Sequence, residues 1–278
     1  MKRITIAKNT LQILDNGQYA LSDGRIIGIA KSLKKCLAQT HYFEPEPLVS
    51  IKETLLKQDK PYAKTEFEVN NETTLTGMES LSRLPELPKI GVLNFASAKN
   101  PGGGFLNGAH AQEESLARSS GLYYSLLKAR NYYAQHRSQK SCLYSDRMIY
   151  SPDCPVFRRD NGELLNESYQ VDFITSPAPN AGVVIRNEPQ NADKIQEVLV
   201  ERGAKVLGLL AHFGCHSLVL GAWGCGVFRN DPAMVADMFY QLLGPGGPFE
   251  GHFQQVRFSV LDRSKAETTY LEFKQRFT

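Results

Sequence analysis

Apolar residues recur along the chain at two spacings, one typical of helices and one typical of strands. In the second half, short continuous apolar runs alternate with stretches in which apolar residues return at helical intervals. Val256, Phe258 and Val260 alternate instead with polar residues, which predicts a strand with one buried face. Strands that alternate with helices predict a layered α/β fold.

The pattern predicts the following elements. Strands are expected at 67–69, 90–96, 148–150, 156–158, 171–175, 217–221 and 256–260. Helices are expected at 4–14, 28–39, 113–128, 191–213 and 232–243. A Pro- and Glu-rich piece at 41–47 interrupts the helical pattern of the first part. We therefore expect a helical segment over about 1–65 at the start of a single domain that covers 1–278.

Composition and charge narrow the class of protein. Hydrophobic residues make up 42% of the 278 residues and charged residues 22%, as in ordinary globular proteins. The net charge of +3 suits an anionic ligand but is too small and dispersed to predict a nucleic-acid groove. No apolar run approaches the roughly 20 residues of a membrane span, and the start at Met1 lacks the apolar segment of a secretion signal. No membrane association is expected.

The cysteines and histidines offer little support for a disulfide framework or a metal centre. Five cysteines are an odd number at no framework spacing, which favours free thiols in a reducing cytoplasm. The cluster His212-Phe-Gly-Cys-His216 supplies two imidazoles and a thiol, but no second ligand pair occurs elsewhere. A helix end with ordinary polar residues explains the cluster better, so we expect neither a metal nor a cofactor.

Three consecutive glycines, Gly102 to Gly104, follow the predicted strand 90–96. Glycine backbone exposes its N–H groups and tolerates positive φ, so this loop can wrap closely around an anion. Glu113 and Glu114 follow at the start of a predicted helix, where acidic residues can simply offset the helix dipole. Carboxylates beside a phosphate cradle suggest a phosphorylated sugar, with the diphosphate on the glycines and a glutamate at the sugar carbon.

A second glycine-rich loop, Gly221-Ala-Trp-Gly-Cys-Gly-Val-Phe228, leads from another buried strand to a helix that begins at Pro232. It is either a tight turn or an anion site, because helix N-termini favour negative charge. Two such loops are expected to converge at the carboxyl edge of the sheet. Phe228 either stacks on a ligand ring or packs in the core. The NTPase and dinucleotide fingerprints do not fit, since Phe105-Leu-Asn follows the glycines.

Four motifs occur in a specific order: Asn94-Phe-Ala-Ser, Asn100-Pro-Gly-Gly-Gly, Gln112-Glu-Glu and Gly221-Ala-Trp-Gly-Cys-Gly-Val-Phe. This order resembles the microbial-type poly(ADP-ribose) glycohydrolases. The resemblance extends over the whole chain, including the N-terminal Ile6-Ala-Lys-Asn-Thr-Leu-Gln-Ile-Leu. It implies a macrodomain-like fold, a three-layer α/β/α arrangement with a mixed central sheet and an N-terminal helical extension.

The resemblance also implies roles for individual residues. Glu114 would be the catalytic carboxyl group, Glu113 would hold ribose hydroxyls, and Gln112 would support the loop. Either Asn94 or Asn100 would bind the distal ribose; general macrodomains carry Asn-Ala-Ala-Asn where this chain has Asn94-Phe-Ala-Ser. The complete set of implied substrate-binding residues is Asn94, Asn100, Gly102, Gly103, Gly104, Gln112, Gly224, Cys225, Gly226, Val227 and Phe228.

The activity implied by the resemblance is hydrolysis of the ribose–ribose O-glycosidic bonds of poly(ADP-ribose), with release of ADP-ribose. Glu114 would protonate the departing 2′ oxygen and then take a proton from the attacking water. Two alternatives stay open: a module that binds ADP-ribose without cleaving it, and a hydrolase of mono-ADP-ribosyl linkages on protein or nucleic acid. The expected partners are poly(ADP-ribose) and ADP-ribosylated proteins, and the expected state is a monomer.

Overall fold

A computed structural model of the chain describes residues 3–85 and 88–278. Its strands are β1 (Gln18–Ala20), β2 (Ile26–Gly28), β3 (His41–Phe43), β4 (Glu66–Asn70), β5 (Ile90–Phe95), β6 (Met148–Arg158), β7 (Leu164–Ser176), β8 (Ser217–Leu220) and β9 (Gln255–Ser259). Its α-helices are α1 (Arg3–Asn16), α2 (Ala30–Gln39), α3 (Pro45–Leu55), α4 (Thr74–Ser82), α5 (Gln112–Ser119), α6 (Leu122–Lys128), α7 (Arg130–Ser138), α8 (Ala181–Asn187), α9 (Ile195–His212), α10 (Pro232–Leu243) and α11 (Thr268–Phe277). Short 3-10 turns occur at η1 (Phe105–Asn107) and η2 (Pro189–Lys194).

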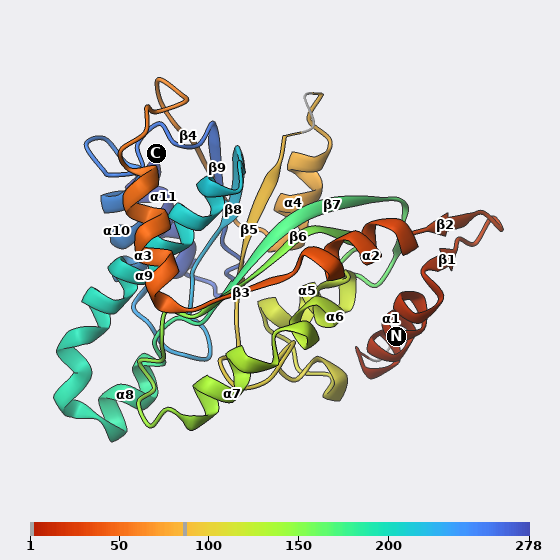
Figure 1. Cartoon of the computed structure of the whole chain (residues 1–278), viewed down its shortest axis with the longest axis horizontal. Coiled ribbons are helices and arrows are strands. Elements are labelled where there is room, and N and C mark those ends of the chain that lie inside the picture. Colours follow the sequence, from red (N-terminus) through yellow and green to blue (C-terminus); the bar gives the residue numbers. More distant parts are fainter. Residues whose placement is uncertain (1–2, 86–87) are drawn as a thin grey trace.

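The centre of the molecule is a seven-stranded sheet in the order β3-β6-β7-β5-β8-β9-β4 (Figure 1). The neighbouring strands β7, β5, β8, β9 and β4 are parallel to one another. β6 is antiparallel to both of its neighbours, β3 and β7. Strands β1 and β2 form a separate hairpin. Because β7, β5, β8 and β9 are parallel neighbours, the loops that follow them leave the sheet at one edge.

Helices cover both faces of the sheet, so the fold has three layers. In β8, Leu218 and Leu220 belong to one apolar core and Val219 to the other, as alternation along a strand requires. Residues of α3, α9, α10 and α11 complete the first core, and residues of α2, α4, α5, α6 and α7 the second. Close packing needs a glycine at one point: a Cβ on Gly91 of β5 would lie 2.6 Å from Leu210 of α9. The α/β/α arrangement with a mixed sheet agrees with the resemblance.

Several predicted elements are confirmed by the structure. The predicted helix 4–14 is α1, and 232–243 coincides with α10, whose start is fixed by Asp231. The Asp231 carboxylate accepts hydrogen bonds from the N–H groups of Ala233 at 2.8 Å and Met234 at 3.4 Å, the usual arrangement of an N-cap. The predicted strands 67–69, 90–96, 171–175, 217–221 and 256–260 correspond to β4, β5, β7, β8 and β9.

The continuous helix predicted at 113–128 is wrong, because the chain breaks it into α5 and α6. Ser120 has an extended backbone (φ −148°, ψ 178°) and forms a bridge to Val156 of β6. The apolar positions of the two helices fall on one helical pattern, so their spacing did not indicate the break. A tertiary contact with the sheet decides it.

Other differences also arise from contacts that the local pattern does not contain. The predicted strands 148–150 and 156–158 are a single strand, β6, with an irregularity between Ser151 and Cys154. The predicted helix 28–39 starts at Ala30, and the predicted helix 191–213 starts at Ile195 after η2. Segment 41–47 forms β3 and begins α3, and the helices α4, α7, α8 and α11 were not predicted.

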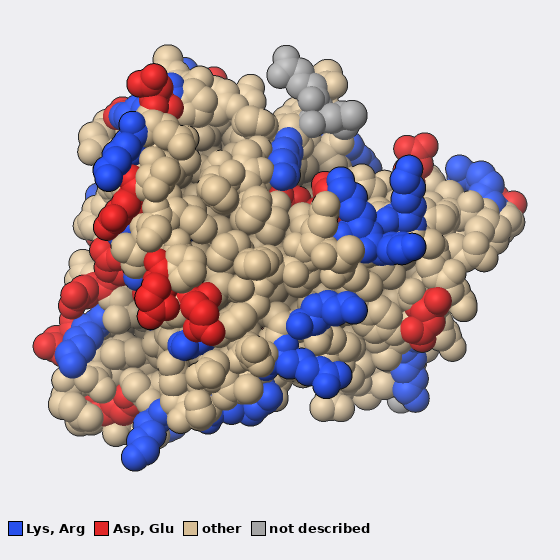
Figure 2. Space-filling model, viewed as in Figure 1, with Lys and Arg blue, Asp and Glu red and all other residues tan. Residues whose placement is uncertain are grey.

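The N-terminal segment contains α1, α2 and α3, but it also contributes β3 to the central sheet. Met1 and Lys2, which open the predicted segment 1–65, lie outside the described residues. None of the described helices combines the length and the apolar composition that a membrane crossing requires. On the face drawn in Figure 2, Lys and Arg gather over the half that contains α2, and Asp and Glu lie mainly along the opposite side.

Candidate active site

The triple-glycine loop leaves the carboxyl end of β5 and lies directly on the start of α5. Gly102 and Gly103 have positive φ values of 67° and 57°, which other residues rarely adopt. A Cβ atom on Gly103 would lie 2.2 Å from Oε1 of Glu114 and 3.3 Å from Oε2 of Glu113. The absence of side chains therefore lets the loop backbone approach both carboxyl groups.

Glu114 is half-buried in the first turn of α5. Its Oε1 accepts a hydrogen bond of 2.9 Å from the N–H of Gly104, and its Oε2 accepts one of 2.9 Å from the N–H of Ala111. The bond from Ala111 caps α5, so the simple explanation of an acidic residue at a helix start also applies. Helix capping does not explain the bond from Gly104, which joins the carboxylate to the triple-glycine loop.

Glu113 has a different environment, since only 3% of its surface is exposed. Its Oε2 accepts a hydrogen bond of 2.7 Å from the N–H of Ser97, and its Oε1 a longer one of 3.4 Å from Nδ2 of Asn94. Burial away from water raises the pKa of Glu113 to about 8, and the neighbouring charge of Glu114 acts in the same direction. Glu113 is therefore mostly a neutral carboxylic acid at pH 7.

The two candidate asparagines occupy different places. Asn94 has no exposed surface, and its Nδ2 donates to Oγ1 of Thr175 at 3.1 Å as well as to Glu113. Its Oδ1 has no hydrogen-bond partner among the described residues. Asn100 is exposed in the glycine loop, where its carbonyl accepts from the N–H of Gly103 at 3.0 Å. The Asn94 side chain thus lies beneath Glu113, and the Asn100 side chain faces outward.

Gln112 connects the start of α5 to the end of the sheet. Its Oε1 accepts from the N–H of Phe95 at 2.8 Å, and its Nε2 donates to the carbonyl of Leu93 at 2.8 Å. Nε2 also lies 3.3 Å from Oγ1 of Thr74, at the start of α4. The Gln112 amide therefore continues the hydrogen bonding of β5 and holds the two glutamates at this edge.

The second glycine loop leaves the same edge of the sheet, because β8 is parallel to β5. Gly224 has a φ of 74°, and a Cβ on it would lie 2.5 Å from Cβ of Ala178. Asn230 donates to the carbonyls of Pro179 at 2.8 Å and Gly224 at 3.1 Å. Buried Trp223 donates to the carbonyl of Ser176 at 3.1 Å. These contacts hold the loop after β8 against the loop after β7.

The tip of the second loop is open to solvent. Gly226 is exposed, and Val227 is 79% exposed. Cys225 is half-buried, and burial raises the pKa of its thiol to about 12, so it is not a thiolate at pH 7. Phe228 is half-buried with its ring centroid 5.9 Å from that of Tyr144. Phe228 is therefore neither fully buried in the core nor fully free to stack on a ligand, the two alternatives that the sequence left open.

The sequence did not indicate Tyr144 and Arg202, which shape this side of the site. Tyr144 has an uncommon positive φ of 58°. Arg202 is 1% exposed and donates to the carbonyls of Leu143, Tyr144 and Pro177, at 3.0, 3.3 and 2.8 Å. Asp146 pairs with Arg202 at 2.8 Å. The sequence did contain one signal for this role of Arg202, since it is a charged residue among the apolar positions of the predicted helix 191–213.

The candidate metal ligands do not converge. Nδ1 of His216 lies 2.7 Å from the hydroxyl of Tyr62, and the Cys215 thiol lies 3.8 Å from Oδ2 of Asp172. The ring of His212 packs edge-on against Phe213. Within residues 3–85 and 88–278, no group of three or more His, Cys, Asp and Glu side chains is arranged to hold a metal ion.

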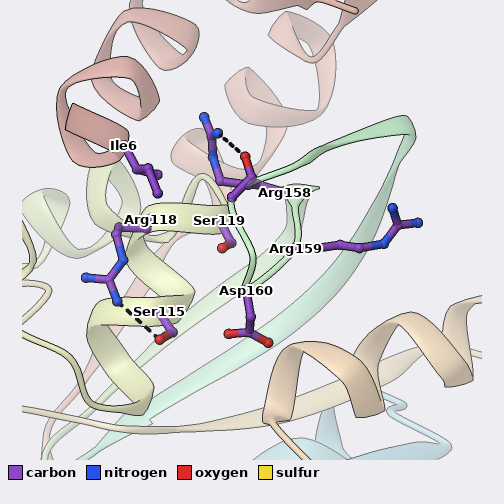
Figure 3. Close-up of a pocket in the computed structure, with 8 residues that line it drawn as sticks. Ile6, Ser115, Arg118, Ser119, Arg158, Arg159 and Asp160 are labelled. Carbon is purple, nitrogen blue, oxygen red and sulfur yellow. Dashed lines mark hydrogen bonds between the residues drawn. The ribbon is translucent and has the colours of Figure 1, made fainter. Parts of the chain in front are cut away.

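Two cavities lie beside the site rather than in it. One of about 10 Å³, room for about one water, lies between α1, α5 and the end of β6 (Figure 3). The described residues that line it include Ile6, Ser115, Arg118 and Asp160. The other, of about 670 Å³, is lined by Ile90 at the start of β5, by residues 165–172 of β7 and by the end of α4. Neither lining set contains a residue of the two glycine loops.

Comparisons with known proteins agree with this geometry. Residues 7–159 match a family model described as microbial-type PARG, catalytic domain. A poly(ADP-ribose) glycohydrolase from Thermomonospora curvata is 47% identical, with a TM-score of 0.94 and 99% of each chain covered. The same enzyme bound to the inhibitor ADP-HPD is 46% identical, with a TM-score of 0.91 and the same coverage. A comparison with curated proteins gave no match.

A second bacterial enzyme extends the similarity to a ligand complex. Poly(ADP-ribose) glycohydrolase from Deinococcus radiodurans in complex with ADP-ribose is 45% identical, with a TM-score of 0.82. That alignment covers 88% of this chain and 96% of the other. The family model covers more than half of this chain, and the solved structures cover nearly all of it. The chain belongs to the family of microbial-type poly(ADP-ribose) glycohydrolases.

Proposed function

We propose that this protein hydrolyses the ribose–ribose O-glycosidic bonds of poly(ADP-ribose) and releases ADP-ribose, with Glu114 as its general acid and base. Its similarity to glycohydrolases bound to ADP-ribose and to ADP-HPD supports the reaction. The observation that carries the assignment to Glu114 is its 2.9 Å bond to the backbone of the triple-glycine loop. The bond brings a carboxyl group to the place where a diphosphate-linked ribose would lie.

In the proposed reaction, Glu114 starts in its protonated form. Its proton moves to the 2′ oxygen of the leaving adenosine ribose while the bond from that oxygen to C1″ of the distal ribose breaks. The distal ribose becomes an oxocarbenium-like cation, which the adjacent diphosphate stabilises. Water then attacks C1″ and gives a proton to the Glu114 carboxylate, which restores the acid. No second carboxylate has to act as a nucleophile.

Glu113 would hold ribose hydroxyls from beneath the loop. Its Oε2 faces Gly103, and its raised pKa leaves the carboxyl mostly uncharged at pH 7. A neutral acid can donate a hydrogen bond to a hydroxyl and adds little repulsion beside a diphosphate. Asn94 would position Glu113 through its amide, so we assign the direct contact with the distal ribose to the exposed Asn100.

The glycine loops would hold the diphosphate close against their backbone. Gly102, Gly103 and Gly104 would line one side, where the N–H groups of Gly103 and Gly104 already donate to Asn100 and Glu114, and Gln112 would hold their support in place. Gly224, Cys225, Gly226 and Val227 would contribute from the other side, at the start of the segment that leads to α10. Phe228 would pack at the distal ribose or adenosine end, against Tyr144.

We further propose that the enzyme acts as a monomer in the cytoplasm on poly(ADP-ribose) and ADP-ribosylated proteins. Free thiols support the compartment, since Cys36, Cys142, Cys154, Cys215 and Cys225 form no disulfide. Cell fractionation with an antibody, together with light scattering of the purified protein, tests both statements. Recovery from an oxidising compartment or a stable dimer would contradict them.

The decisive experiment measures release of free ADP-ribose from automodified poly(ADP-ribosyl)ated protein by the wild type, Glu114→Gln and Glu113→Gln. Glu114→Gln should lose about 10²–10⁴ in rate, because an amide cannot exchange the catalytic proton. Its affinity for ADP-ribose should persist, since the glycine loops hold the diphosphate. A wild type that binds ADP-ribose but releases none would be a binding module. Full activity of Glu114→Gln would exclude Glu114 as the acid.

A further inference from the structure

Cationic side chains from separate elements surround His110, four residues before Glu114. Arg118 of α5 lies 3.2 Å from Nδ1 of His110 through its NH2, and donates to the carbonyl of Ala109 at 2.7 Å. Arg3 of α1 reaches the same loop, since its Cβ lies 3.8 Å from the position of a Cβ on Gly108. Both helices therefore place arginines beside the segment that leads into the catalytic turn.

Arg263 belongs to a third part of the chain, the loop that follows β9, and its charge acts on His110. β9 is parallel to β8, so this loop leaves the sheet at the active-site edge. The neighbouring Asp262 accepts a hydrogen bond of 2.9 Å from Asn71, just before α4. The start of α4 contacts Gln112 through Thr74. The loop that carries Arg263 is thus linked through α4 to the residue preceding the two glutamates.

These cations are available to a ligand. Arg3 and Arg263 are exposed, and neither forms an ion pair with another residue in the described parts of the chain. Arg118 is 6% exposed and contacts His110 through its guanidinium group. The charged groups that act on His110 are the guanidinium groups of Arg3, Arg118 and Arg263 and the carboxylate of Asp160, so positive charge exceeds negative charge around this imidazole.

His110 adds an uncharged donor to the surface. A guanidinium only donates, so Nδ1 of His110 accepts from Arg118, and its Nε2 carries the proton. Partial burial and the positive charges of Arg3, Arg118 and Arg263 lower the pKa of His110. The imidazole is therefore neutral at pH 7 and presents an N–H group from an exposed side chain.

We propose that Arg3, His110 and Arg263 form a binding surface for the diphosphate of the leaving ADP-ribose unit, the part of the polymer that remains after cleavage. This inference rests on the proposed function. Glu114 would protonate the 2′ oxygen of that unit, and the diphosphate of the same unit follows only a few covalent bonds away. The glycine loops would hold the other diphosphate, that of the released ADP-ribose, so the polymer needs a second cationic surface beyond Glu114.

The cavity in Figure 3 is too small to hold the diphosphate, so the proposed site lies on the surface rather than in this cavity. The guanidinium of Arg118 points toward Ser115 there, while Ile6 of α1 and Asp160 border the same space. A volume of about 10 Å³ is too small for a phosphate group. The exposed Arg3, His110 and Arg263 side chains are the groups that a polymer can reach without displacing α1.

The test compares two substrates that share the same scissile ribose: long poly(ADP-ribose), and ADP-ribose carrying a neutral alkyl group on C1″ as its leaving group. Arg3→Glu/Arg263→Glu should lower kcat/KM on the polymer by about tenfold or more at low salt, because a favourable field becomes repulsive. Its kcat/KM on the alkyl glycoside and its affinity for ADP-ribose should stay within about twofold. The wild-type rate on polymer should fall with added salt more steeply than the rate on the glycoside.

Lys57→Glu/Lys64→Glu is the matched control, since both lysines are exposed and precede the amino end of β4, at the opposite edge of the sheet. It makes the same charge change and should leave both rates unaltered. If the arginine variant is poorly folded by its melting temperature, Arg3→Gln/Arg263→Gln replaces it. Equal losses on the two substrates, or polymer losses that the lysine control reproduces, would overturn the proposal. A wild type that cleaves neither substrate would refute the proposed function instead.

Discussion

Two adjacent glutamates have different surroundings when a helix turns one inward and the other toward a loop. Glu113 points into the protein, where the N–H groups of Ser97 and Asn94 donate to it, and no Lys or Arg of the described residues forms an ion pair with it. Glu114 points to the glycine loop and keeps contact with solvent. We therefore expect Glu113 to contribute shape and hydrogen bonding, and Glu114 to contribute the exchangeable proton.

The raised pKa of Glu113 predicts a specific dependence of stability on pH. In the unfolded chain the carboxyl group titrates near 4.5, whereas in the folded protein it titrates near 8. The folded state thus holds the proton more tightly, and stability falls as pH rises from about 4.5 through 8. Glu113→Gln cannot ionise, so its melting temperature should fall less over pH 5–8 than that of the wild type.

The difference between wild type and Glu113→Gln over this pH range should be on the order of a few kcal/mol in the free energy of unfolding. Other titrating groups cancel in this comparison, because both proteins contain them. Urea unfolding at pH 5 and pH 8 measures the difference. Parallel pH profiles of the two proteins would show that Glu113 has an ordinary pKa.

At the scale of elements, the glycine loop and α5 act as one unit. Gly103→Ala would force a side chain into a left-handed conformation and place its Cβ 2.2 Å from Oε1 of Glu114. We expect a loss of ADP-ribose release of about 10²-fold, since displacement of the proposed catalytic carboxyl would remove its contribution. ADP-ribose affinity should weaken as well, because in the proposed site the same loop would hold the diphosphate.

Gly28→Ala is the control for this substitution. Gly28 has no positive φ, and a Cβ on it would meet no atom of residues 3–85 and 88–278 within 4 Å. The control should keep both activity and affinity. Steady-state assays and calorimetry with ADP-ribose check the pair, and circular dichroism shows whether Gly103→Ala stays folded. Wild-type activity of Gly103→Ala would mean that the loop can move away from Glu114 without consequence.

For the whole molecule, ligand binding should stabilise the complete fold. The site is assembled by loops from β5, β7 and β8, which hold together only in the folded state. ADP-ribose at about 100 times its Kd should therefore add about 2.7 kcal/mol of stability and raise Tm measurably. AMP or ribose alone should raise Tm much less, since each occupies part of the site. No shift at millimolar ADP-ribose would contradict the proposed site.

The protein should also work without a bound metal. Its proposed chemistry uses a carboxyl group and backbone donors, and the His212, Cys215 and His216 side chains each contact a different partner. ADP-ribose release should therefore be unaffected by EDTA. An activity that EDTA abolishes and one divalent cation restores would show that an acidic or histidine site contributes to catalysis.

The sequence by itself determined the elements and motifs whose information is local. Alternation and helical spacing predicted β9 and α1, and the start of α10 was evident from Asp231-Pro232. The glycines near Glu113 and Glu114 predicted a diphosphate site, which stays a prediction, because glycine has backbone freedom that no other residue has. These signals depend only on residues that are close together in the sequence, so they can be recognised without knowledge of the fold.

Only the tertiary structure decided which groups are buried, charged or joined. The bridge from Ser120 to β6 divides a helix whose pattern is continuous, and burial is the main cause that raises the pKa of Glu113 above that of an ordinary carboxyl group. Arg202 anchors two loops that lie far from it in sequence. Hydrogen bonds and desolvation depend on contacts between distant segments, and a residue pattern contains no record of those contacts.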